Sequence, residues 1–216
     1  MIQLPRLYCI ADSAFFLNTK ELLVFAEELA AGGCTLLEYR NKSGNARVML
    51  EQARELKKRL THPVARGATR VGQPYVRLIM NDRADLCLAA EFDGVHIGQE
   101  DLSIEAVRRI IGSDRWLGVS THNSEQLREA DQTSADYLAI GPVFATSSKE
   151  RPDPLVGLEG VCRARALTRK PLVAIGGITR ANAASVIEAG ADSVAVISDL
   201  LPDPRKSAEE FFRVLR

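Results

Sequence analysis

The sequence predicts a single (β/α)8 barrel, in which eight parallel strands alternate with eight helices. Three observations support this prediction: eight short, β-rich apolar runs recur along the chain, segments with helical spacing of apolar residues separate them, and a polar residue or a glycine follows each run. The runs cover residues 7–10, 36–39, 78–80, 94–97, 116–119, 137–140, 172–175 and 193–197. Strand-then-helix repetition requires parallel pairing with right-handed crossovers.

An open, doubly wound sheet is the alternative arrangement of the same elements. It would need a glycine-rich turn for phosphate after the first strand, and residues 11–15 contain no glycine. An average of 27 residues per unit, 216 divided by eight, is compact but suits a barrel. We therefore expect one barrel domain over residues 1–216, with a surface insertion at about 62–75, where Pro and Gly replace the apolar periodicity.

The helices between the runs are indicated by apolar spacing, as in residues 22–30, and by residues typical of helix ends. Side chains that cap helix starts occur where starts are expected, at Asn18 or Thr19, Ser103, Asn123 and Thr179. Glycines that end helices occur at Gly32, Gly33, Gly112 and Gly190.

Composition narrows the class of partner. The 28 Lys and Arg residues balance the 28 Asp and Glu residues, and no basic stripe is present, which argues against nucleic acid or a membrane surface. No apolar run approaches the roughly 20 residues of a membrane span. The four cysteines include no Cys-x-x-Cys pair, as expected of core thiols in a reducing compartment. We expect a cytoplasmic protein that binds small molecules, and the sequence leaves open assembly into a homo-oligomer.

In a barrel, the residues that follow the strands converge on one rim, where catalytic groups are placed. Here those residues are consistently polar or glycine. They are Asp12, Glu38, Arg40, Lys42, Asn81, Asp82, His96, Gln99, Asp101, Ser120, His122, Gly141, Thr146, Ser148, Lys149, Gly176, Gly177 and Ser198.

Glu38, Arg40 and Lys42 alternate at period two, so an extended segment sends all three side chains to the same side. Arg supplies a planar fork for phosphate and Lys a mobile point charge, as a polyphosphate substrate requires. Three solvated charges at a strand end are the alternative reading.

Asp82 and Asp101 end neighbouring strands, and their oxygens suit Mg²⁺ that keeps several waters and binds substrate phosphates. The alternative is that these two aspartates cap helices.

Two later segments are typical of phosphate binding. Gly176 and Gly177, with residues 196–198 after the eighth strand, resemble the phosphate cradle that barrels build from loops seven and eight. The hydroxyl-rich segment 145–149 could close over phosphate groups, although a plain surface loop has the same composition. We expect an orienting role for His96, which lies within a strand, and a hydrogen-bonding or acid–base role for the more exposed His122.

Over nearly its whole length the sequence resembles the thiamine phosphate synthase family. The resemblance is carried by residues 40–42 (Arg-Asn-Lys), 81–86, 93–102 (Asp-Gly-Val-His-Ile-Gly-Gln-Glu-Asp-Leu), 118–122, 136–144 with its Gly-Pro-Val-Phe, and 174–178 (Ala-Ile-Gly-Gly-Ile). It implies a Mg²⁺-dependent transferase of thiamine biosynthesis, which joins 4-amino-2-methyl-5-hydroxymethylpyrimidine diphosphate to 4-methyl-5-hydroxyethylthiazole phosphate and releases pyrophosphate.

The resemblance also implies roles for individual residues. It assigns Arg40, Asn41, Lys42, Asn81, Ser120 and Lys149 to the pyrimidine diphosphate, Asp82 and Asp101 to Mg²⁺, and Thr146, Ser147, Ser148, Gly177, Ile197 and Ser198 to the thiazole phosphate. Arg40, Lys42, Ser120 and Lys149 would act in catalysis. Two positions depart from the family pattern: Glu38 stands where the family has Gln, at the pyrimidine site, and Ser148 stands where it more often has Thr.

Two alternative functions remain at the level of sequence. A related thiazole tautomerase would use His122 as an acid–base and would need neither Mg²⁺ nor a diphosphate site, so retention of Asp82, Asp101 and Lys42 favours the synthase. A non-catalytic homologue of the thiamine pathway that binds or regulates is the second alternative, which Glu38 leaves open.

Overall fold

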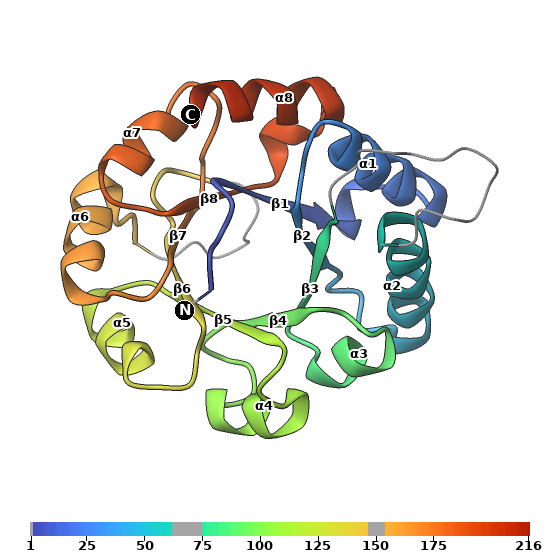
Figure 1. Ribbon diagram of the computed structural model, residues 1–216, viewed down its shortest axis with the longest axis horizontal. Coiled ribbons are helices and arrows are strands. Elements are labelled where there is room, and N and C mark those ends of the chain that lie inside the picture. Colours follow the sequence, from blue (N-terminus) through green and yellow to red (C-terminus); the bar gives the residue numbers. More distant parts are fainter. Residues whose placement is uncertain (1, 62–74, 147–153) are drawn as a thin grey trace.

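The computed structural model describes residues 2–61, 75–146 and 154–216, and within them eight parallel strands close into a barrel in chain order. Helices surround the barrel on the outside (Figure 1), which confirms the predicted fold class. The strands are β1 (Leu7–Asp12), β2 (Leu36–Arg40), β3 (Arg77–Asn81), β4 (Gly94–Ile97), β5 (Trp116–Thr121), β6 (Tyr137–Ile140), β7 (Leu172–Ile175) and β8 (Ser193–Val196).

The helices of the described residues run back along the outside of the barrel. They are α1 (Thr19–Ala31), α2 (Ala46–Thr61), α3 (Ala84–Ala89), α4 (Ile104–Ile111), α5 (Ser124–Asp131), α6 (Gly157–Leu167), α7 (Ala183–Glu188) and α8 (Pro204–Val214), with short 3-10 helices η1 (Ser13–Phe15) and η2 (Ser198–Leu200). Within the described part of the chain, none of them combines the length and the apolar character that crossing a membrane requires.

Three of the expected helix starts are confirmed and one is wrong. The side chains of Asn18, Ser103 and Asn123 accept N–H groups of the first turns of α1, α4 and α5. Thr179 does not start α7, which begins at Ala183. The reason is Asn182, whose side chain accepts the N–H of Thr179 at 2.8 Å and holds residues 179–182 in a turn.

The predicted insertion falls between α2 and β3, and its residues 62–74 lie outside the described residues. Its last residue, Tyr75, donates its hydroxyl to Asp93 at 2.5 Å.

Two apolar clusters hold the barrel together. The larger lies between the strands and the helices, and the smaller lies inside the barrel. The interior cluster consists of Tyr8, Ile10, Leu36, Ile79, Tyr137, Ala139, Val173 and Ala195. Because side chains alternate along a strand, the strand register carries the interior positions onward into polar residues near the carboxyl ends, where Glu38 pairs with Ile10 and Asn81 pairs with His96.

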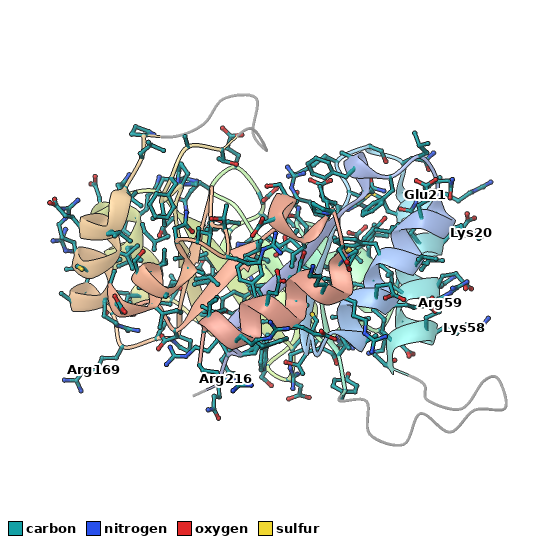
Figure 2. The ribbon with its side chains drawn as sticks, turned by 90° about the horizontal axis from the view of Figure 1, so that it is seen from above. Lys20, Glu21, Lys58, Arg59, Arg169 and Arg216 are labelled. Carbon is teal, nitrogen blue, oxygen red and sulfur yellow. The ribbon has the colours of Figure 1, made fainter. Side chains whose placement is uncertain are left out.

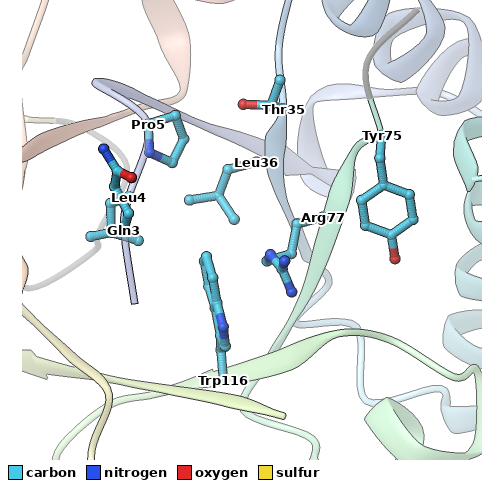
Figure 3. Close-up of a pocket in the computed structure, with 8 residues that line it drawn as sticks. All are labelled: Gln3, Leu4, Pro5, Thr35, Leu36, Tyr75, Arg77 and Trp116. Carbon is cyan, nitrogen blue, oxygen red and sulfur yellow. The ribbon is translucent and has the colours of Figure 1, made fainter. Parts of the chain in front are cut away.

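The amino-terminal end of the barrel is closed by its own set of side chains. Ile2 and Leu4 pack against the interior cluster, and the Arg77 guanidinium lies 4.0 Å from the centre of the Trp116 ring. A pocket at this end is lined by the residues drawn in Figure 3, and those residues are distinct from the rim residues predicted above. In Figure 2 the start of α1, marked by Lys20 and Glu21, lies above the end of α2, marked by Lys58 and Arg59, so the carboxyl ends of the strands face upward.

Gly118 makes the interior packing possible. A Cβ at this position would lie 2.0 Å from the Tyr137 ring and 2.3 Å from its hydroxyl oxygen. Tyr137 is fully buried and pairs with Gly118 in the register of β5 and β6. Only a residue without a side chain leaves room for the tyrosine to cross the barrel.

We therefore predict that Gly118→Ala destabilises the fold by about 3 kcal/mol or more, because overpacking a filled core forces strained rotamers and backbone shifts. Urea unfolding of Gly118→Ala should show a lower midpoint than the unmodified chain. Gly44→Ala is the control, since a Cβ there meets nothing within 4 Å although the backbone φ is +74°. Equal midpoints for the two variants would contradict the role of Gly118.

Candidate active site

Five side chains, joined by consecutive hydrogen bonds, cross the barrel just below the rim. The hydroxyl of Tyr8 (β1) donates to Glu38 (β2) at 2.9 Å and lies 3.0 Å from the hydroxyl of Tyr137 (β6). The Tyr137 hydroxyl lies 3.1 Å from Nδ1 of His96 (β4), and Nε2 of His96 lies 2.8 Å from Oγ of Ser120 (β5). We call these five residues the interior relay, which links Glu38 to Ser120 through consecutive hydrogen bonds.

Burial governs the charge of the interior relay. Tyr8, Tyr137 and Glu38 are each at most 3% exposed. Burial raises the pKa of Glu38 to about 7, although the hydrogen bond from Tyr8 and the cations Arg40 and Lys42 act in the opposite direction. Burial also raises the pKa of both tyrosines well above their usual range and lowers the pKa of His96 to about 4. At neutral pH the three middle members of the relay are therefore uncharged.

Arg40 and Lys42 reach in different directions and are both paired with carboxylates. Arg40 forms an ion pair with the buried Asp12 of β1, and Lys42 forms one with Asp82, directly after β3. Asp12 also accepts the N–H of Ala14, so its carboxylate is held in place from two sides. The alternative, in which Glu38, Arg40 and Lys42 are solvated charges at a strand end, is wrong for Glu38 and Arg40. The side chain of Lys42 is half exposed at the rim.

Asp82 and Asp101 do not cap helices, so the capping alternative is wrong. The residue before α3 is Arg83, and α4 is capped by Ser103. Asp82 instead adopts a left-handed backbone with φ of 61°, a conformation that Asp tolerates better than most residues. The carboxylate of Asp101 accepts the N–H of Gly98 at 2.7 Å.

The two aspartates fit a metal that needs few protein ligands. They are close enough that Asp101 raises the pKa of Asp82, after the larger effect of burial and against the opposing effect of Lys42. Neighbouring carboxylates of this kind are stabilised by a divalent cation. Mg²⁺ takes carboxylate oxygens together with waters and phosphate oxygens, and the two aspartates supply carboxylate oxygens of this kind. Among the described residues they are not part of a group of three or more His, Cys, Asp or Glu side chains that could hold a metal.

The two predicted asparagines have different environments. Asn81 lies inside the barrel, and its buried Nδ2 has no hydrogen-bond partner among the described residues. An orphaned donor of this kind indicates a ligand position, because leaving it unpaired costs free energy. Asn41, in contrast, is buried between β2 and α2, where Nδ2 donates to Tyr39 and to Gln52 at 3.0 Å each. The structure therefore does not bring Asn41 to the rim.

The loops after β6, β7 and β8 are tied together at the rim. Val143 and Phe144 donate their N–H groups to the carbonyls of Ile175 and Gly176 at 2.9 and 3.0 Å, which brings Phe144 and Ala145 against Gly177. Thr146, the next residue, is half-buried. Gly177 has φ of 63°, and a Cβ there would lie 2.4 Å from the Ala145 carbonyl oxygen. The backbone of Gly177 therefore lies close to the backbone of Ala145, as the predicted phosphate cradle of Gly176, Gly177 and residues 196–198 requires.

The cradle differs from the prediction in one respect. No helix starts directly after Gly177, because α7 begins only at Ala183. The link between the last two loops is instead Arg180, which donates its backbone N–H and its guanidinium to Asp199 at 2.8 to 3.1 Å. Asp199 follows Ser198, which is exposed, while Ile197 is half-buried against the interior cluster.

Some predicted residues lie apart from this arrangement. Ser147, Ser148 and Lys149 fall outside the described residues. His122 is half-buried, and its Nδ1 lies 2.7 Å from the carbonyl oxygen of Gly141.

The sequence did not indicate Tyr8 and Tyr137 as parts of the site, and it indicated Asp12 only as a rim residue. The signal that could have found them is the period-two alternation of interior positions. Tyr8, Ile10 and Asp12 lie at alternate positions of β1, and a tyrosine at the strand interior needs a hydrogen-bond partner.

The sequence model of a known family, described as thiamine monophosphate synthase, matches residues 7–200. A thiamine-phosphate synthase of Koribacter versatilis is 56% identical over 217 aligned residues, covering 99% of this chain and 97% of the relative. One from Chloroflexus aurantiacus is 42% identical, covering 89% and 83%. Among solved structures, a thiamine phosphate pyrophosphorylase from Pyrococcus furiosus superposes with a TM-score of 0.81 at 32% identity, covering 97% of this chain and 95% of the other.

The raised pKa of Glu38 predicts a pH-dependent stability. A carboxyl that binds its proton more tightly in the folded state contributes stability that is present below about pH 4.5 and is lost as the pH rises through about 7. The free energy of unfolding of Glu38→Gln, relative to that of the unmodified chain, should therefore be higher at pH 8 than at pH 5, by at most about 3 kcal/mol. Thermal unfolding at the two pH values measures this, with Glu51→Gln on the exposed face of α2 as the control. A Glu38→Gln effect that does not change with pH would contradict it.

Proposed function

This chain belongs to the thiamine monophosphate synthase family, and we propose that it joins the pyrimidine diphosphate to the thiazole phosphate to form thiamine phosphate and pyrophosphate. The observation that carries the proposal is the rim itself. Arg40, Lys42 and the neighbouring Asp82 and Asp101 lie at one end of the barrel, where the resemblance assigns the diphosphate. Asn81, whose Nδ2 has no hydrogen-bond partner among the described residues, lies at the same end. The chain spans 97% of the Koribacter versatilis relative and 83% of the Chloroflexus aurantiacus relative.

The mechanism follows from the leaving group. The bond between the pyrimidine methylene and the diphosphate oxygen breaks, and its electron pair leaves with pyrophosphate. The 4-amino-pyrimidine can support the positive charge that develops on the methylene. The lone pair of the thiazole nitrogen then forms the new C–N bond, so no base has to remove a proton from that nitrogen. Catalysis of this kind depends on positioning and electrostatics rather than on a protein nucleophile.

The rim residues supply those effects in this account. Arg40 is held by the buried Asp12, and Lys42 is held by Asp82, so both cations are directed before substrate binds. They stabilise the departing diphosphate together with Ser120 and with Lys149, which lies outside the described residues. Asn81 donates to the pyrimidine diphosphate through Nδ2, which has no partner in the described part of the chain. Gly177, Thr146, Ile197 and Ser198 hold the thiazole phosphate, together with Ser147 and Ser148, which lie outside the described residues.

Asp82 and Asp101 would hold Mg²⁺, which when bound neutralises charge on the diphosphate and makes it a better leaving group. The proximity of the two carboxylates supports this assignment. We further propose that the enzyme acts in the cytoplasm, as a biosynthetic enzyme with phosphorylated substrates.

A thiazole tautomerase is disfavoured by two observations. The first is that a proton shift has no use for the neighbouring carboxylates of Asp82 and Asp101. The relatives named above are described as synthases.

The direct test is to incubate the purified chain with both substrates and Mg²⁺ and to measure thiamine phosphate. We predict that Asp82→Asn and Asp101→Asn each lower kcat at least about 100-fold at saturating Mg²⁺, because each removes one of the two proposed carboxylate ligands. Asp85→Asn is the matched control, since Asp85 lies in the same segment but forms an exposed ion pair with Arg83.

Circular dichroism should show that the fold of all three variants is retained. If Asp82→Asn and Asp101→Asn work as well as Asp85→Asn, the metal assignment is wrong. If the unmodified chain forms no thiamine phosphate with Mg²⁺ present, the proposed reaction is wrong.

A further inference from the structure

The interior relay can hold its protons in only two complete arrangements. Tyr8, Tyr137 and neutral His96 each contribute one proton and one acceptor, so all of their hydrogen bonds must run in the same direction. The direction is decided by the two ends of the relay, which are Glu38 and Ser120.

An ionised Glu38 can only accept hydrogen bonds. Tyr8 then donates to Glu38, Tyr137 donates to Tyr8, and Nδ1–H of His96 donates to Tyr137. Nε2 of His96 is left without a proton and accepts from the hydroxyl of Ser120. In this arrangement the only proton of Ser120 points away from the rim.

A side chain at position 38 that donates to Tyr8 reverses every bond. Tyr8 then donates to Tyr137, Tyr137 donates to Nδ1 of His96, and Nε2–H of His96 donates to Ser120. The hydroxyl proton of Ser120 is released to the rim, where a phosphate oxygen can accept it. A neutral Glu38 can donate in this way, and so can a Gln that replaces it.

We propose that the side chain at position 38 sets the direction of the interior relay and so determines whether Ser120 donates a hydrogen bond to the bound diphosphate. Tyr8, Tyr137 and His96 are positioning residues in this account, since they act through Ser120. The inference rests on the proposed function in one respect, the placement of the diphosphate at Ser120.

The relay also offers a route by which a buried carboxylate exchanges its proton. Ser120 is half-buried near the rim, whereas Glu38 is 3% exposed. When a proton enters at Oγ of Ser120, the Ser120 proton moves to Nε2 of His96, the Nδ1 proton moves to Tyr137, the Tyr137 proton moves to Tyr8, and the Tyr8 proton moves to Glu38. One proton is taken from solvent and one reaches the carboxylate, so the charges balance.

The groups around Glu38 place this change near neutral pH. Glu38 faces Tyr8 from β1, Tyr137 from β6, Asp82 after β3, and Arg40 and Lys42 from its own strand and the residues that follow. Burial and Asp82 favour the neutral acid, whereas Tyr8, Arg40 and Lys42 favour the carboxylate, and the resulting pKa is about 7.

The test reads the tautomer of His96 directly. Nitrogen-15 NMR of histidine-labelled protein, without substrate, distinguishes Nδ1–H from Nε2–H imidazole. We expect His96 to change from the Nε2–H form at pH 6 to the Nδ1–H form at pH 9, with Glu38→Gln showing no change over that range. The three histidines are assigned with His62→Gln and His122→Gln.

Two further variants separate the relay from a general effect of pH. Tyr137→Phe removes the central hydroxyl and should abolish the change, whereas Tyr39→Phe, a buried tyrosine bonded to Gln52 outside the relay, should keep it. Tyr8→Phe replaces Tyr137→Phe if the latter does not fold. A single His96 tautomer across the pH range in the unmodified chain, or the same change in Glu38→Gln, would overturn the proposal.

A kinetic measurement tests the link to the diphosphate. The kcat for thiamine phosphate should fall as the pH rises through the midpoint seen by NMR, and this fall should be absent in Glu38→Gln and in Ser120→Ala. If the fall persists in Ser120→Ala, Glu38 acts on the substrate without the relay, and the proposal is wrong. If no thiamine phosphate forms at any pH, the proposed function fails, while the NMR result still decides the direction of the relay.

Discussion

The structure depends on the closure of eight parallel strands around one axis, which turns every second side chain of each strand into the same narrow interior. At the amino-terminal end the interior positions are filled by Leu36, Trp116 and other largely apolar groups, so packing alone satisfies them. Toward the carboxyl end the same positions carry Glu38, Asn81 and His96, which bring polar atoms into a space with little water. Each of those atoms must find a partner, because an unpaired buried polar group costs more than a hydrogen bond gains.

The partners found within the chain define the chemistry of the rim. Glu38 and His96 are satisfied by the tyrosines of the interior relay, and Arg40 is satisfied by Asp12. Among the described residues Nδ2 of Asn81 has no partner. Asp82 and Asp101 lie close together although Lys42 binds the first and the Gly98 N–H binds the second, and we propose that a ligand completes these three residues. Under the proposed function, a phosphorylated substrate would supply oxygens for the Asn81 donor, and a divalent cation would supply positive charge for the two carboxylates. The polar residues near the carboxyl ends of the strands therefore bear on both the stability of the barrel and its proposed function.

Sequence reasoning predicted the fold and most of the rim because both follow from periodicity. Eight apolar runs separated by helical segments require parallel strands, and residues such as Asp82 and Ser120 lie where those strands end. It could not predict which polar groups would pair across the barrel, since the partners Tyr8 and Tyr137 are 129 residues apart and meet only on closure. It also could not reveal that the Asn41 side chain, which the family resemblance assigned to the pyrimidine diphosphate, bonds to Gln52 from the following helix. The start of α7 was wrong for a similar reason, since the Asn182 side chain holds a local turn.

The most direct measurement of the central claim is phosphorus-31 NMR of a single reaction that contains the purified chain, both substrates and Mg²⁺. The account predicts that one pyrophosphate appears for each thiazole phosphate consumed, with the thiamine phosphate signal growing at the same rate. Release of pyrophosphate without loss of thiazole phosphate would show hydrolysis of the pyrimidine diphosphate alone. Conversion of thiazole phosphate without release of pyrophosphate would show a rearrangement of the thiazole, and either result would contradict the assignment of this rim to the joining of the two substrates.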